Sequence, residues 1–292
     1  MGQVVRTISH DASVVATAID ATDIISEAEQ VHKTSAVVTA ALGRLTVAAS
    51  LMGIGLKGRE DSVTLRMNGG GPCGTLIAVA DGTGNVKCYV QNPVVEIPLN
   101  SKGKLDVAGA VGKDGTLSVV KDMGLKEPYS GQIPITSGEI AEDIASYFAL
   151  SEQIPTVCGL GVLVNPDLTV KAAGGYLIQL LPFTDESVID ILEANVNKLP
   201  PVTKMLSDGI TADKMAHMVL EGLEPDILDT FDAKYKCDCS KERVERALIS
   251  IGRKELEQMA DEPQEVCCHF CSKKYTFSPE DMKKLLDRGT DK

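Results

Sequence analysis

Cys237-Asp238-Cys239 and Cys268-His269-Phe270-Cys271 are two closely spaced thiol pairs that decide how the last part of this chain folds. Each pair can occupy one edge of a tetrahedron around a metal ion. The stretch from Cys239 to Cys268 is long enough to fold back and bring the two pairs together. The pattern therefore predicts a four-cysteine site that binds one zinc ion per chain.

Composition limits the classes of protein to which the chain can belong. It has 292 residues, of which 43% are hydrophobic, so it can bury a substantial core. Its net charge of −12 repels phosphate backbones and anionic lipid surfaces, so we expect no nucleic-acid partner and no membrane partner. The sequence shows no secretory signal and no segment that reads as a membrane span. We expect a cytoplasmic protein, in which paired cysteines favour metal binding over permanent disulfides.

Hydrophobic periodicity predicts an α+β fold. From about Asp23 to Lys57 the chain is apolar and free of proline, which indicates one long helix or two helices joined near Gly43. Alternating residues at 63–67 and 86–90, separated by glycine-rich turns, indicate strands of an antiparallel sheet. Further strands and then helices are expected at 157–164, 168–181, 185–199 and 212–223.

The sequence divides into three parts. Residues 1–223 are predicted to form an N-terminal α+β domain that ends in helices. Residues 224–236 mix Pro225 with acidic and large apolar residues, which favours a helical linker of low local stability that lies against a neighbour. Residues 237–292 would form the small zinc domain, which needs a metal to hold it. Its expected helices are 241–250, 253–260 and a short one after Ser278.

Two interpretations of the thiol cluster are open from the residues alone. In the first, zinc is passive, and its binding free energy of about 10 to 16 kcal/mol simply folds a small domain. In the second, oxidation joins Cys237 with Cys239 and Cys268 with Cys271, and zinc leaves because a disulfide sulfur is not a competent ligand. Loss of the metal would then unfold the domain, free the linker and expose apolar surface.

Two hypotheses from other classes compete with a switch. The first is an enzyme in the N-terminal domain with a purely structural zinc, favoured only by the glycine-rich turn at 69–74. No Gly-Lys-Ser/Thr follows this turn, so it does not read as an ATP-binding loop. The second is a docking module whose positive charge comes from Lys273, Lys274, Lys283 and Lys284. The cysteines outside the cluster, Cys73, Cys88 and Cys158, are expected to be small buried hydrophobes.

Several segments resemble the heat shock protein 33 family, which are redox-regulated chaperones of bacteria. Besides the two cysteine motifs, they are Gly69-Gly70-Gly71-Pro72-x-Gly74, Leu117-Ser118-Val119-Val120-Lys121-Asp122 and Ala173-Gly174-Gly175. The resemblance covers nearly the whole chain. It implies an ATP-independent holdase, a chaperone that binds unfolding client proteins. It also implies that the protein is not an enzyme. Such a protein is inactive with zinc on four thiolates, is activated by peroxide or hypochlorous acid under unfolding conditions, and is commonly a dimer when active.

The family's functional residues carry over by position. Its four zinc ligands fall on Cys237, Cys239, Cys268 and Cys271. Its redox-sensitive linker falls roughly on residues 224–236, and its chaperone core domain falls on residues 1–223. The chain departs from the pattern at Cys267, a fifth thiol directly beside Cys268. This extra thiol could pair wrongly or act as a resolving group, so the ligand assignment is more direct than the disulfide assignment.

Overall fold

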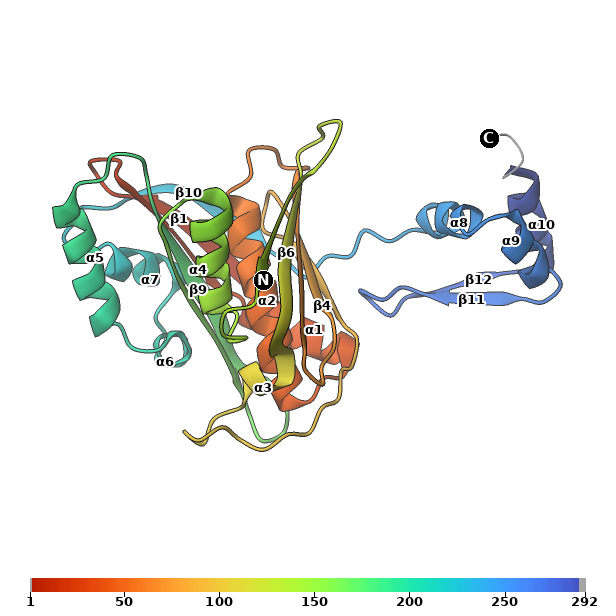
Figure 1. The fold of residues 1–292 in the computed structure, drawn as a ribbon, viewed down its shortest axis with the longest axis horizontal. Coiled ribbons are helices and arrows are strands. Elements are labelled where there is room, and N and C mark those ends of the chain that lie inside the picture. The colour runs from red at the N-terminus through yellow and green to blue at the C-terminus, as the bar shows by residue number, and fades with distance from the viewer. Residues whose placement is uncertain (1, 289–292) are drawn as a thin grey trace. The chain divides into compact units, whose positions relative to one another are not determined.

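The computed structural model describes residues 2–288, which belong to two compact units (Figure 1). One unit comprises residues 1–236 and the other residues 237–292. Within the described residues, the first unit holds two five-stranded sheets, and the second holds a two-stranded hairpin with three helices. This mixture of sheets and helices confirms the α+β class predicted from the sequence.

Both sheets of the first unit are antiparallel throughout. The first runs in the order β10-β1-β2-β9-β8. Its strands are β1 (Gly2–Ile8), β2 (Val14–Asp20), β8 (Thr156–Val164), β9 (Val170–Leu180) and β10 (Asp226–Ala233). The second runs in the order β5-β4-β3-β6-β7. Its strands are β3 (Ser62–Gly70), β4 (Leu76–Asp81), β5 (Val86–Val90), β6 (Gly112–Asp122) and β7 (Tyr129–Pro134). The strands expected from alternation are confirmed.

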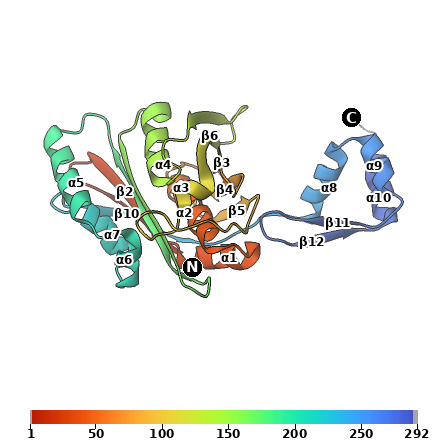
Figure 2. The same ribbon diagram turned by 60° about the horizontal axis from the view of Figure 1, so that its bottom comes forward.

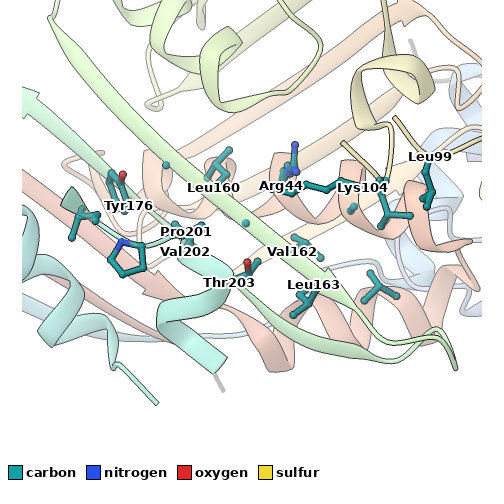
Figure 3. Close-up of a pocket in the computed structure, with 18 residues that line it drawn as sticks. Arg44, Leu99, Lys104, Leu160, Val162, Leu163, Tyr176, Pro201, Val202 and Thr203 are labelled. Atoms are coloured by element: carbon teal, nitrogen blue, oxygen red, sulfur yellow. The ribbon is translucent and has the colours of Figure 1, made fainter. Parts of the chain in front are cut away.

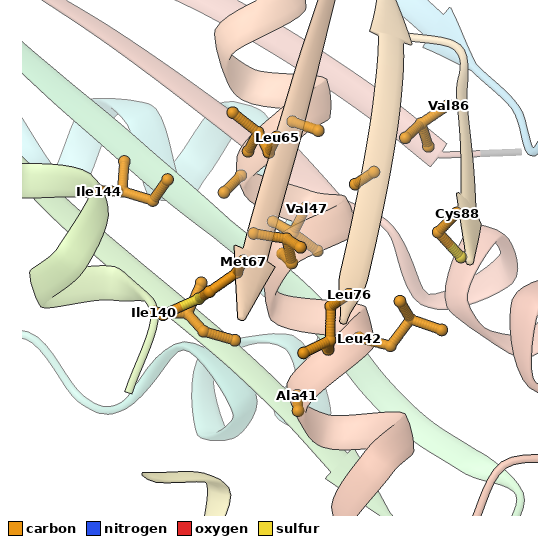
Figure 4. Packing of buried hydrophobic residues seen from close by; sticks show 14 of the residues in the cluster. Ala41, Leu42, Val47, Leu65, Met67, Leu76, Val86, Cys88, Ile140 and Ile144 are labelled. Atoms are coloured by element: carbon orange, nitrogen blue, oxygen red, sulfur yellow. The ribbon is translucent and has the colours of Figure 1, made fainter. Parts of the chain in front are cut away.

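One long apolar helix, α2, carries the main core of the first unit (Figure 4). The helical segments of this unit are α1 (Thr22–His32), α2 (Ala36–Ile54), α3 (Val107–Val111), α4 (Ala141–Tyr147), the π-helical η1 (Phe148–Glu152), α5 (Glu186–Lys198), α6 (Val202–Ser207) and α7 (Ala212–Val219). Leu42 and Val47 of α2 belong to one buried cluster with Leu65 of β3 and Leu76 of β4. The helix also packs on β8 and β9, so it contacts both sheets.

The length and apolar composition of α2 would suffice to cross a membrane, which corrects the expectation that no segment of the chain meets that test. The structure gives the helix a different role, because 94% of its apolar window is buried inside the protein. A helix that is apolar on all sides is buried either in lipid or in a protein core, and here the core surrounds it.

The break between α1 and α2 lies at 33–35, not near Gly43 as the sequence suggested. Lys33 adopts a left-handed backbone, with φ of 53°, and ends α1. Gly43 lies inside α2 for a packing reason. A Cβ atom there would lie only 2.9 Å from side-chain carbons of both Ile25 and Val162. The glycine therefore permits a close approach of α2 to its neighbours and does not end a helix.

Helices α5, α6 and α7 cover the other face of the first sheet (Figure 2). Ala16 and Ala18 of β2 pack in a cluster with Met205 and Met215 from these helices, whereas Ile19 belongs to the main core. Successive side chains of a strand point to opposite faces, so β2 is buried on both sides. The two apolar clusters are therefore separate layers on either side of one sheet.

The segment after Pro225 is extended, which corrects the prediction of a helical linker. It forms β10, and β10 pairs antiparallel with the edge strand β1. Val86 of β5 then donates to Lys234 O at 2.9 Å and accepts from Lys236 N at 2.9 Å. Pairing with these sheet edges satisfies backbone groups that would otherwise be left open, so tertiary context overrides local preference.

The second unit has a small core built from short elements. These are α8 (Lys241–Ser250), α9 (Arg253–Met259), β11 (Gln264–Cys267), β12 (Lys274–Phe277) and α10 (Pro279–Arg288). The three helices agree with the sequence prediction. At the start of α10, Ser278 Oγ accepts from Asp281 N at 3.1 Å while Ser278 N donates to Asp281 Oδ2 at 3.1 Å. This reciprocal capping fixes where the helix begins.

Replacing Gly43 with valine is expected to lower the free energy of unfolding of the first unit by about 2 to 3 kcal/mol, because the new side chain overpacks a filled core. Chemical denaturation followed by circular dichroism measures the change. Gly55→Ala is the control, because Gly55 is exposed and its nearest non-neighbouring atom, Met52 O, lies 3.3 Å from the added Cβ. Equal loss of stability in the two variants would contradict the packing argument.

Candidate metal centre

The second unit gathers the four cysteines that the sequence singled out. Their sulfur atoms all lie within 4.8 Å of one another, and the residues are Cys237, Cys239, Cys268 and Cys271. The sulfurs of Cys237 and Cys268 are 3.7 Å apart, and those of Cys239 and Cys271 are 3.4 Å apart. These two contacts join one thiol pair to the other, so residues far apart in the sequence form a single cluster.

Two kinds of local structure hold the thiols in place. Cys237 and Cys239 lie in the extended stretch before α8, where Ser240 Oγ accepts from Arg243 N and caps the helix. Cys268 and Cys271 lie in the turn between β11 and β12. In this turn Cys268 N donates to Lys273 O at 2.9 Å, so the hairpin fixes both sulfurs.

The cluster has the chemistry and the size of a zinc site. Zinc lies about 2.3 Å from each thiolate sulfur, and a tetrahedron of that radius spaces the sulfurs about 3.8 Å apart. The contacts of 3.4 and 3.7 Å are close to that spacing. Four sulfur donors favour zinc or another soft ion over magnesium or calcium. All four cysteines are half-buried, so these residues fit a bound metal ion.

Hydrogen bonding inside the cluster spreads the pKa values of the thiols. Burial acts to raise the pKa of Cys239, but the hydrogen bond from Tyr275 Oη and the contacts with the other thiols outweigh it and lower that pKa to about 7. Burial is the main cause that raises the pKa of Cys237. Tyr275 Oη lies 3.1 Å from the Cys239 sulfur, a contact that the sequence reasoning missed.

The other thiols lie apart from this cluster. Cys267 is exposed on β11, and His269 is not part of the group of four. Burial raises the pKa to about 11 for Cys73 and Cys88, and to about 12 for Cys158. Because the thiolate is the reactive form, these three cysteines are poor nucleophiles at neutral pH. Cys73 and Cys88 are buried, and the half-buried Cys158 packs against the same core, which agrees with the expectation that they act as small hydrophobes.

The glycine-rich turn at 69–74 has a packing explanation. Gly71 N donates to Val111 O at 3.0 Å, and a Cβ atom on Gly71 would lie 2.5 Å from Ala110 O. A Cβ atom on Gly69 would lie 2.2 Å from Gly112 O. The turn therefore needs glycine because two backbone segments meet there. This contact removes the reason for reading the turn as a ligand-binding loop.

A cavity of about 650 Å³ lies beside the edge strand β8 (Figure 3). Its lining is mostly aliphatic, with Arg44, Lys104, Tyr176 and Thr203 as the larger polar side chains. No carboxylate, imidazole or thiol is among the lining side chains, so the cavity lacks the groups that most often act as general acid and base. The cavity gives the enzyme hypothesis no support.

Of the four lysines of the docking hypothesis, Lys273 directly precedes β12, Lys274 begins that strand, and Lys283 and Lys284 lie on α10. Lys274 Nζ pairs with Glu265 at 2.8 Å, and Lys273 Nζ lies 5.2 Å from the centre of the Tyr275 ring. Lys283 and Lys284 are exposed. Two of the four charges therefore already have partners inside the unit, which weakens the case for a dedicated positive surface.

Comparison with known proteins gives a consistent result. A model of the Hsp33 protein family matches residues 2–278. The 33 kDa chaperonin of Clostridium botulinum (strain Eklund 17B / Type B) is 46% identical over 273 residues, 93% of this chain and 92% of the relative. That of Bacillus velezensis is 44% identical over 292 residues, 99% of this chain and 100% of the relative.

A solved structure resembles the whole chain. It is the crystal structure of the 33 kDa chaperonin (heat shock protein 33 homolog) from Thermotoga maritima, which is 37% identical and superposes with a TM-score of 0.90. The match covers 99% of each chain. The resemblance that the cysteine motifs and the glycine-containing segments suggested is confirmed over nearly the full length. This chain belongs to the Hsp33 family, whose members named above are 33 kDa chaperonins.

Proposed function

We propose that this chain is a redox-regulated, ATP-independent chaperone that binds unfolding proteins and prevents their aggregation under oxidative stress. In the reduced state one zinc ion is held by Cys237, Cys239, Cys268 and Cys271, and the chaperone is off. The observation that carries the proposal is the four-sulfur cluster itself, which begins one residue after a segment bonded to both sheet edges. The active form is a homodimer, and the protein works in the cytoplasm.

Oxidation supplies the chemistry of the switch. Two thiolates and one peroxide molecule give one disulfide and two hydroxide ions, so each disulfide costs the site two ligands. We propose the pairs Cys237 with Cys239 and Cys268 with Cys271. The 3.7 and 3.4 Å contacts run between these pairs, so the sulfurs must rearrange as the metal leaves.

The apolar core of the second unit is too small to keep the unit folded after the metal is lost. Seven buried side chains form this core: Leu248, Leu256, Ala260, Tyr275, Phe277, Met282 and Leu285. Zinc bound to four thiolates contributes about 10 to 16 kcal/mol, which is as large as the whole stability of an average domain. The second unit therefore unfolds when its thiols are oxidised.

The segment 226–236, which is the last part of the first unit, passes this unfolding on to the rest of that unit. The side chains of β10 are mostly exposed, so the strand is held by backbone pairing and little apolar burial. Its firmest attachment is Tyr235, which is 8% exposed. The Tyr235 hydroxyl lies 3.1 Å from His32 Nε2 and 3.3 Å from Cys88 O. Tyr235 stands two residues before Cys237. Unfolding of the second unit therefore disturbs the contacts of Tyr235 before those of the rest of the segment.

Release of the segment creates a surface for clients. The edge of β1 loses its partner, and the pocket that held Tyr235 opens. An unpaired strand edge beside apolar side chains is a surface to which an extended, unfolded chain can add as another strand. The sequence carries no Gly-Lys-Ser/Thr loop for ATP, so oxidant and reductant, with no nucleotide, set the state of the protein.

Peroxide at raised temperature is expected to release about one zinc ion per chain and to remove about four free thiols in parallel, because the same sulfurs bind metal and react. A metallochromic dye and a thiol reagent measure both quantities, and light scattering of a denatured client measures chaperone action. Cys267→Ser should leave the coupled loss unchanged. Equal suppression of aggregation by the reduced zinc form would contradict the switch.

Tyr235→Phe is expected to speed chymotrypsin cleavage at Phe231 by about threefold to tenfold, because the anchor loses hydroxyl hydrogen bonds while its ring still packs. The cleavage rate of the reduced, zinc-loaded chain is the measurement. Tyr129→Phe is the matched control, since its exposed hydroxyl contacts Ser151 and lies outside the segment. Identical cleavage rates in wild type and Tyr235→Phe would refute the anchor.

Acid is expected to loosen the same anchor. Burial lowers the pKa of His32 below its ordinary value of 6.5, so the folded state favours neutral imidazole. The stabilisation is complete above 6.5 and is lost as pH falls through the lowered folded pKa. Cleavage at Phe231 should therefore rise from about pH 7.5 to about pH 5.5, and less so in His32→Gln. The ratio of wild-type to variant rates cancels the pH dependence of the protease, and a constant ratio would disprove a role for His32.

A further inference from the structure

A tyrosine hydroxyl is directed at one sulfur of the metal centre. Tyr275 Oη donates a hydrogen bond to the Cys239 sulfur over 3.1 Å. The ring that carries this hydroxyl belongs to the small core of the second unit, where it is only 7% exposed. One side chain therefore takes part both in the packing of the unit and in the immediate surroundings of a thiolate.

The packing keeps this hydroxyl in place. Tyr275 lies on β12, directly opposite Val266 of β11. Lys273 Nζ stands 5.2 Å from the centre of its ring. Phe277, two residues further along the same strand face, is fully buried in the same cluster. A ring packed in this way holds its hydroxyl beside the sulfur while the hairpin stays on the core.

A hydrogen bond to a thiolate changes the reactivity of the sulfur. It draws on the lone pair that attacks an oxidant, so a bonded thiolate is a weaker nucleophile than a free one. Hydrogen bonds to charged groups are about twice as strong as neutral ones, so the effect on a rate is measurable. The same bond also fixes the orientation of a metal ligand.

We propose that Tyr275 is a positioning residue that restrains Cys239 from reacting with oxidant while the β11–β12 hairpin is packed. The proposal rests on the redox switch proposed above and names its point of control. When heat loosens the hairpin, the hydroxyl withdraws and Cys239 becomes the faster nucleophile. Oxidation of Cys239 is therefore slower while the hairpin is packed than after it has loosened.

The restrained step balances with peroxide as the oxidant. The Cys239 thiolate attacks one peroxide oxygen, the O–O bond breaks, and the products are the sulfenic acid and hydroxide. The Cys237 thiolate then attacks the Cys239 sulfur, an S–S bond forms, and a second hydroxide leaves. Two electrons pass from the two sulfurs to peroxide. Tyr275 donates a hydrogen bond before the first attack and is unchanged at the end.

The test is the rate at which the full, zinc-loaded chain releases zinc under peroxide. Tyr275→Phe keeps the buried ring and removes the hydroxyl, so release at room temperature should be about fivefold faster than in wild type. The ratio of the variant release rate to the wild-type release rate should fall at heat-shock temperature, where the wild-type hairpin is already loosened. In the cobalt-substituted chain the sulfur-to-metal charge-transfer band should move to lower energy, because a sulfur lone pair has lost its hydrogen bond.

Controls separate this role from simple loss of stability. Phe277→Leu weakens the same core without removing a donor to sulfur, so it should leave the charge-transfer band in place. Tyr129→Phe should leave both rate and band unchanged. Chain labelled throughout with 3-fluorotyrosine keeps every ring and carries a stronger donor, so it should release zinc about twofold more slowly.

The outcomes distinguish the two proposals. A wild-type chain that keeps its zinc under peroxide at every temperature would refute the redox switch itself. A wild-type chain that releases zinc, together with a Tyr275→Phe variant of equal rate, would overturn the role of Tyr275 alone. An unshifted cobalt band in Tyr275→Phe would also overturn it, whatever the rate. A faster rate with a shifted band would support it.

Discussion

The meeting of four sulfur atoms from two distant thiol pairs is the constraint on which the second unit depends. Each pair alone offers two ligands, and only the folded hairpin and the stretch before α8 bring all four within 4.8 Å. The apolar core beside them contains few side chains, so a bound metal would supply most of the stability. A unit held in this way is sensitive to any reaction that consumes thiolate.

The first unit, by contrast, is stabilised by a large apolar core. Its main core surrounds α2 and extends across both sheets, and a second apolar cluster lies beneath α5, α6 and α7. This amount of apolar burial stabilises a fold without a metal ion. In the proposed function, the chain therefore joins a first unit that folds without a metal to a second unit that folds only around one. That asymmetry permits one part to open while the other keeps its shape.

The segment before the second unit is less firmly held than the core of the first unit. Residues 226–236 complete the edges of two sheets by backbone pairing, yet most side chains of β10 remain exposed. Two residues of the segment are buried, Ala233 at the end of β10 and Tyr235 beyond it, and the Tyr235 hydroxyl lies near His32. Edge pairing with little burial gives an attachment that is specific and weak. Such an attachment suits a contact that must be made in one state and broken in another.

The sequence was sufficient wherever the signal is local. Thiol spacing identified the four cysteines that come together, because two thiols two or three residues apart can chelate the same ion whatever surrounds them. Local patterns also placed β3, β5, β8 and β9 of the first unit and the three helices of the second unit, whereas the strands β11 and β12 of the second unit were not predicted. A few specific motifs were also enough to indicate the family, which the comparisons then confirmed.

Only the tertiary structure decided which groups meet. The sequence suggested a helix junction at Gly43 because a glycine often ends a helix. It could not show that side-chain atoms of Ile25 and Val162 occupy the space where a Cβ atom would lie. Residues 224–236 read as helical because the open edge of β1, which makes β10 a strand, lies more than 200 residues away in the chain. The hydroxyls of Tyr235 and Tyr275 carried no sequence signal at all. Hydrogen-bond partners depend on positions in space, and residues distant in sequence fix those positions.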